Sequence, residues 1–104
     1  FQLKNINQQE LVNNYYDDFV NKMKKDPKSA YNKLDSDYKS SRFKTFESFE
    51  KYINSYINSN RFLSEYKMTK YESYTELICY DNYGIVWIFN ISGIMNYTIL
   101  LDIL

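Results

Sequence analysis

Apolar residues recur at helical spacing in the first half of the chain. Four of them stand four positions apart, at Leu11, Tyr15, Phe19 and Met23. Asn and Asp residues fill the opposite face, so this spacing predicts a long amphipathic helix with these four side chains on its apolar face. Asn7 followed by Glu10 resembles a capping box. We therefore expect residues 1–7 to form a loose or extended lead-in and the helix to begin after them.

Capping signals predict three more helices before residue 60. Asp26 followed by Pro27 is typical of a helix start and predicts a second helix to about Leu34. Residues 35–43 favour a short, turn-rich helix that Asp35 and Asp37 cap. Thr45 is expected to cap a further helix that ends near residue 58. Its predicted buried face carries Phe46, Phe49, Tyr52 or Ile53, and Tyr56 or Ile57.

After residue 60 the pattern changes to alternation, which is typical of half-buried strands. We expect strands within residues 63–74, at 77–80, at 85–91 and at 95–102. Residues 81–84 supply a turn in which Gly84 takes the positive φ, and Ser92 with Gly93 is predicted to make the next turn. In the last segment Met95, Tyr97, Ile99 and Leu101 alternate with polar residues. Strands joined by such short turns form an antiparallel meander.

The fold class predicted is α+β, with N-terminal helices packed on a C-terminal curved antiparallel sheet. Glycine and proline are scarce and no linker or repeat interrupts the 104 residues, so residues 1–104 are expected to form a single domain. The strand at 85–91 is apolar on both faces. Its second face needs cover, whether from a curled sheet edge, an oligomer partner or a cavity.

Composition excludes several classes of chemistry. Histidine is absent, which removes histidine-dependent nucleophilic catalysis and nearly every transition-metal site. Two glycines cannot build a phosphate-binding or dinucleotide-binding loop, so no cofactor is expected. Cys79 lies in an apolar run and is expected to be a small core residue. The formal net charge is zero, and the one basic cluster, at residues 22–28, fits a solvated helix end, so no nucleic-acid partner is expected.

The acidic pairs do not indicate a catalytic or metal site. Asp17 and Asp18 are adjacent on the polar helix face and are expected to be solvated. Asp35 and Asp37 start a calcium-loop pattern that lacks the required glycine and glutamate further on. We therefore predict no enzyme activity and no metal site.

One group of aromatic side chains with an arginine offers a candidate binding pocket. Its members are Tyr38, Arg42, Trp87 and Tyr97. If the sheet curls around the helix, these side chains could line a cavity in which Arg42 presents a cationic fork to an anion. The alternative is that the aromatics are core residues and Arg42 is exposed.

The segment 29–35, then Tyr38, Arg42 with Phe43, and Phe49 with Tyr52 and Ile53 carry a resemblance. They resemble a group of small uncharacterised domains from low-GC Gram-positive bacteria (Firmicutes), although Lys33 replaces the usual apolar residue. The resemblance implies a cystatin-like or nuclear-transport-factor-2-like α+β roll that follows a membrane anchor, with no assigned activity. The richness in Asn, Lys, Ile and Tyr is also typical of a low-GC genome.

Two features of the sequence bear on where the protein is located. No apolar stretch reaches the ~18–20 residues that span a bilayer, and the chain starts at Phe1, so we expect a piece of a longer protein. The resemblance implies that this longer protein is membrane-anchored and extracytoplasmic. A cytoplasmic location is the alternative. The leading hypothesis is a non-catalytic interaction or ligand-binding module, with a homodimer through the sheet face as one candidate assembly. The alternatives are a structural component of a secretion- or conjugation-type assembly, and a small-molecule-binding protein or enzyme that uses the pocket above.

Overall fold

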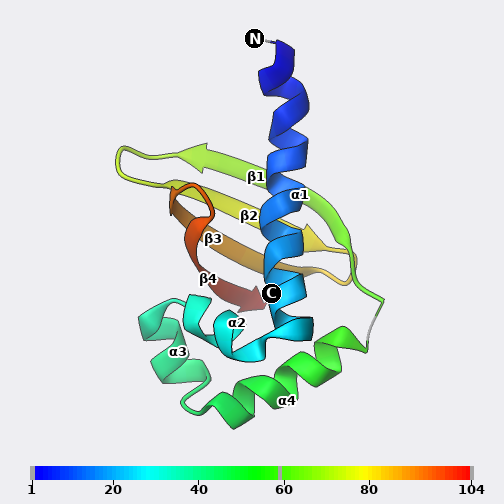
Figure 1. Ribbon diagram of the computed structural model, residues 1–104, viewed down its shortest axis with the longest axis vertical. Helices are drawn as coiled ribbons and strands as arrows, with labels where there is room; N and C mark the ends of the chain where they lie inside the picture. The colour runs from blue at the N-terminus through cyan, green and yellow to red at the C-terminus, as the bar shows by residue number, and fades with distance from the viewer. Residues whose placement is uncertain (1, 59, 104) are drawn as a thin grey trace.

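Four helices are followed along the chain by one antiparallel sheet in the part that the structure describes (Figure 1). The computed structural model describes the backbone of residues 2–58 and 60–103 and the side chains of residues 8–58 and 60–101. The helices are α1 (Gln2–Lys25), α2 (Pro27–Lys33), α3 (Ser36–Arg42) and α4 (Phe46–Ile57). The strands are β1 (Leu63–Lys70), β2 (Thr75–Asp81), β3 (Ile85–Gly93) and β4 (Asn96–Ile103), in the order β1-β2-β3-β4. The predicted α+β class is confirmed, and the sheet is curled and unclosed.

Helix α1 starts earlier than the sequence predicted. The backbone is helical from Gln2, so the extended lead-in was wrong and Asn7 is not the cap. Residues 2–7 contain neither glycine nor proline, so nothing in the sequence stops the helix from extending in that direction. The helix crosses one face of the sheet, and its N-terminal end projects past β1 (Figure 1). Tyr15, Phe19 and Met23 are buried as expected, whereas Leu11, nearer the projecting end, is 43% exposed.

Three of the predicted helix caps are confirmed, those of Asp26, Asp35 and Thr45. Asp26 accepts a hydrogen bond of 2.8 Å from the Ser29 hydroxyl at the start of α2. Asp35 accepts one of 3.2 Å from the backbone N–H of Tyr38 at the start of α3. Thr45 caps α4 in the same way. Asp37 lies within the first turn of α3 instead of capping it, where its charge complements the helix dipole.

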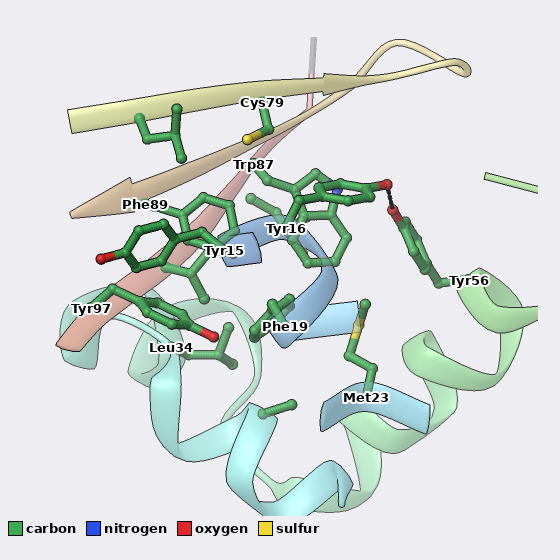
Figure 2. Close-up of a cluster of buried hydrophobic side chains, with 14 of the residues drawn as sticks. Tyr15, Tyr16, Phe19, Met23, Leu34, Tyr56, Cys79, Trp87, Phe89 and Tyr97 are labelled. Atoms are coloured by element: carbon green, nitrogen blue, oxygen red, sulfur yellow. Dashed lines mark hydrogen bonds between the residues drawn. The ribbon is translucent and has the colours of Figure 1, made fainter. Parts of the chain in front are cut away.

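The core lies between the helices and the inward face of the sheet. Its sheet side is built from alternating residues on β2, β3 and β4, among them Leu77, Cys79, Trp87, Phe89, Tyr97 and Ile99. Trp87 is at its centre, with the rings of Phe19 and Tyr56 each 4.9 Å away in edge-to-face contact (Figure 2). Such pairs add about 0.5–1.5 kcal/mol each beyond the area they bury. Many of the aromatic residues in the sequence therefore lie in the core.

The two turns between β2, β3 and β4 differ in how well they were predicted. Gly84 takes the expected positive φ of 83° in the first turn. The second turn lies later than predicted, because β3 continues through Gly93 with a register shift after Ile91. Ile94 and Met95 form the turn instead, and Met95 takes a φ of 53°. A positive φ at a residue other than glycine, asparagine or aspartate is unusual.

Candidate functional site

The four predicted pocket residues come from two parts of the fold, helix α3 and the core face of the sheet. Tyr38 and Arg42 share helix α3, with Tyr38 half-buried and Arg42 exposed over the Phe43 ring. Trp87 and Tyr97 are core residues, 1% and 2% exposed. None of these four lines any of the three surface hollows described below.

Tyr97 contributes instead to a polar cluster on the surface of α1. Its hydroxyl donates a hydrogen bond of 2.7 Å to the Asp18 carboxylate, which also receives one of 2.7 Å from the Lys22 ammonium. Burial opposes ionisation of Asp18, but the hydrogen bonds from Lys22 and Tyr97 outweigh it and lower the pKa of Asp18. Asp17 is exposed as predicted, whereas the prediction for Asp18 was wrong because Tyr97 reaches it from β4.

A buried ion pair joins the start of β1 to the β2–β3 turn. The Asp81 side chain is fully buried, and its carboxylate accepts a hydrogen bond of 3.2 Å from Arg61. The backbone N–H groups of Tyr83 and Ile85 also donate to Asp81, at 2.8 and 3.0 Å. The Arg61 guanidinium lies between two rings, 4.6 Å from the centroids of both Tyr56 and Tyr83. Sequence reasoning placed Asp81 in a turn but gave no role to Arg61.

The tyrosines near this ion pair stay protonated at neutral pH. Tyr16 and Tyr56 share a hydrogen bond of 2.9 Å (Figure 2), and burial raises the pKa of both hydroxyls. Burial also raises the pKa of Tyr52 to about 12. The Tyr52 hydroxyl, the Arg61 Nε and the Trp87 Nε1 are buried and have no hydrogen-bond partner within the described part of the chain. The Arg61 charge is paired with Asp81, so this cluster holds the segment before β1 against the β2–β3 turn.

The largest gathering of exposed apolar side chains is at the tips of the two hairpins. A hollow of about 460 Å³ opens there between α1, the β1–β2 turn and the β3–β4 turn. We call it the tip hollow, and its lining residues that matter here are Leu11, Tyr15, Tyr71, Glu72, Tyr74 and Ile94. Ile94 is 96% exposed and Tyr71 is 50% exposed. Large apolar side chains at such exposure, next to one another, are typical of interaction surfaces.

The β3–β4 turn at the tip hollow is held by one buried hydroxyl. Tyr15 from α1 is 3% exposed, and its hydroxyl donates to the Gly93 carbonyl at 3.3 Å and accepts from the Met95 N–H at 3.1 Å. Two-residue turns ordinarily use asparagine, aspartate or glycine, because those residues tolerate a positive φ. Here Ile94 and Met95 occupy the turn, and Tyr15 stabilises the unfavourable backbone of Met95. Strained residues of this kind cluster at functional sites.

The β1–β2 turn forms the opposite wall of the tip hollow. The Tyr71 backbone N–H donates to the Tyr74 carbonyl at 2.8 Å, which closes a four-residue turn. The two rings stack with centroids 5.0 Å apart. Glu72, between them, is the one charged residue that lines the tip hollow in the described part of the chain. The sequence signal for this site was the placement of tyrosine and isoleucine at turn positions where polar residues are usual.

Two further hollows lie elsewhere on the surface. One, of about 270 Å³, is polar and lies between α1 and β1 beside Gln9 and Glu65. The other, of about 500 Å³, lies beside Arg61, Phe62 and Lys24. Among the described residues, neither has the cluster of exposed apolar side chains that marks the tip hollow.

Neither a metal-binding cluster nor a membrane span is present in the described residues. No three cysteine, aspartate or glutamate side chains there lie close enough to hold a metal ion. None of the described helices is both long and apolar enough to cross a membrane. No protein-family model, curated protein or solved structure matches the chain.

Proposed function

We propose that this domain is a non-catalytic protein-binding module and that the tip hollow is its contact surface. The observation that supports this most is the concentration of exposed apolar groups. Seven large hydrophobic side chains are exposed among the described residues, and five belong to the tip hollow and its turns: Leu11, Tyr71, Tyr74, Ile94 and Met95. Rigid aromatic side chains at the centre of a hollow are the residue types that carry most of the energy at protein interfaces.

The partner expected is a protein segment that inserts an apolar side chain and carries a lysine or arginine beside it. The apolar insert follows from the lining, and the basic neighbour complements Glu72, the one charged lining residue among those described. The hollow is open to solvent, so it cannot enclose a small molecule as ligand pockets usually do. A lipid surface is the less favoured partner, because membrane-binding surfaces are ordinarily rimmed by several basic residues.

We also propose that the domain lies outside the membrane. The resemblance to anchored low-GC Gram-positive domains supports a position outside the membrane. Protease treatment of intact cells that produce the full-length protein tests this, since an extracytoplasmic domain is digested and a cytoplasmic one is protected.

A random peptide display library selected on the purified domain tests the binding function. The expected result is enrichment of peptides that pair a large apolar residue with a basic one, and we expect Ile94→Ser to weaken their binding about tenfold or more. Phe62→Ser is the matched control, since Phe62 is 56% exposed but lies at another hollow. Equal loss of binding with both variants, or no enrichment, contradicts the proposal. Binding to lipid vesicles without any peptide binding favours a membrane surface instead.

A further inference from the structure

The face of the sheet that points away from the helices carries its own apolar patch. We call it the outer patch, and it consists of Ile78 and Tyr80 on β2, Val86 and Ile88 on β3, and Leu100 on β4. The strand register places Ile78, Ile88 and Leu100 in one row, and Tyr80 and Val86 in the next row, which ends at Asp102 on β4. None of the five belongs to the core cluster that holds the buried side chains of the helices. Val86 is buried, whereas the other four are partly exposed, so the described chain leaves most of this apolar face without full cover.

Two opposite charges flank the outer patch on β1. Glu65 lies beside Tyr80 and Lys67 lies beside Ile78, so each row of the patch begins with one charge of a different sign. Both charged side chains are exposed. Residues two apart on a strand are separated by roughly 6.6 Å along it, so the two charges are as far apart as the two rows.

We infer that the outer patch binds a second copy of this chain, face to face, about a two-fold axis. The axis lies between the two sheets, runs across the strands and passes midway between the two rows. This operation places the row of Ile78 and Ile88 opposite the row of Tyr80 and Val86 in the other copy. It also places Lys67 opposite Glu65 of the partner subunit, and Glu65 opposite Lys67 of the partner subunit. The operation also places Leu100 opposite the Asp102 position of the partner subunit, so the face is complementary to itself in polarity and charge over β1, β2 and β3.

The edges of the sheet are less suited to a partner than this face. Edge strand β1 carries Glu65, Lys67 and Lys70 and a register irregularity near Leu63, which are the features that discourage strand addition. Edge strand β4 is partly covered, since Leu34 bridges to Ile99 and the Asp35 N–H donates to the Ile99 carbonyl at 2.8 Å. Association through strand pairing is therefore disfavoured at both edges.

The dimer should be weak. A sheet face of four strands, each about seven residues long, covers on the order of 400 Å² per copy from the usual strand spacings. Two such faces bury on the order of 800 Å² together, which is below the size of stable specific interfaces. The experiment must therefore reach protein concentrations of about 1 mM at low salt, where charge pairs are least screened.

Sedimentation equilibrium of single and double charge variants tests the inference. Lys67→Glu and Glu65→Lys each turn two attractive pairs into two repulsive ones, and we expect self-association of each to weaken about tenfold. The double variant restores both pairs and is expected to associate within about threefold of the unaltered protein.

A mixture of the two single variants supplies an independent check on the register. It should associate more tightly than either variant alone, because both copies then face each other with opposite charges. One copy carries two acidic side chains at positions 65 and 67, and the other carries two basic ones. Both substitutions are on an exposed edge strand, so folding is not at risk.

Two results would overturn this inference. One is a protein that stays monomeric up to about 1 mM at low salt. The other is a dimer whose association does not respond to the charge variants or to their mixture, which would assign it to another face. The test is independent of the tip hollow, since neither Glu65 nor Lys67 lines it.

Discussion

Removal of the Tyr15 hydroxyl should loosen the β3–β4 turn while leaving the core packed. Tyr15→Phe keeps the ring and its edge contacts with Phe89 and Tyr97, whose centroids are 6.3 and 5.6 Å away. It deletes the hydrogen bonds to the Gly93 carbonyl and from the Met95 N–H. The substitution therefore removes the hydrogen bonds that hold the turn and keeps the apolar contacts that hold the helix.

The expected loss of unfolding free energy is about 1 kcal/mol. Each hydrogen bond contributes roughly 0.5–1.5 kcal/mol net, and a buried group left unpaired costs more. Gly93 and Met95 are exposed residues, so water can partly replace the hydroxyl, which places the estimate at the low end for two bonds. For a domain of this size, about 1 kcal/mol lowers the Tm by about 4–6 °C. Exchange of the Met95 amide should accelerate about fivefold or more, the factor that about 1 kcal/mol gives.

Urea unfolding and amide hydrogen exchange together measure this effect. Tyr31→Phe is the matched control, because the Tyr31 hydroxyl donates one hydrogen bond of 2.8 Å to the Phe43 carbonyl, far from the turn. Both variants should lose stability, but only Tyr15→Phe should accelerate exchange at Met95 beyond its global destabilisation. Equal exchange at Met95 in the two variants would refute the idea that Tyr15 holds the turn.

Two further predictions concern the buried polar groups. Asp81→Ala should lower the free energy of unfolding by about 3 kcal/mol, because it leaves Arg61 and the N–H groups of Tyr83 and Ile85 without their acceptor. Asp81→Asn should lower it by only about 1 kcal/mol. Equal midpoints of urea unfolding for the two variants would contradict this prediction. Burial raises the pKa of the Cys79 thiol from its ordinary 9.0 to about 12, so its contribution to stability is intact below pH 9 and is lost as the pH rises from 9 to about 12. Cys79→Ala should therefore reduce the loss of stability between about pH 8 and about pH 11, and an unchanged alkaline loss would argue against a buried thiol.

The elements of the fold were predictable because local signals and tertiary packing agree. Asp26, Asp35 and Thr45 each offer a side-chain oxygen to a helix N-terminus, and each is used in that way. Alternation in the last segment placed Tyr97, Ile99 and Leu101 correctly in the core, since one sheet face meets the helices, whereas Met95 lies exposed in the turn. The start of α1 was misjudged because a capping pattern at Asn7 competes with a helix that nothing interrupts.

The candidate site was not predictable, because it depends on contacts between distant residues. Tyr15 lies 80 positions before Met95, whose N–H its hydroxyl holds, so no local pattern connects them. That contact lets Met95 adopt a positive φ and moves the turn past Gly93, where turn propensity alone had placed it. The proposed pocket of Tyr38, Arg42, Trp87 and Tyr97 rested on residue type alone. Residue type does not distinguish a core aromatic side chain from one at a surface.

The most direct test of the binding proposal is an NMR titration of the isotope-labelled domain with a peptide selected from the display library. We expect amide shifts confined to residues 71–75 and 91–95 and to α1 near Leu11, and we expect these shifts to be lost in Ile94→Ser. Shifts centred on the outer patch or beside Arg61, or shifts that persist in Ile94→Ser, would contradict the assignment of the tip hollow as the binding surface.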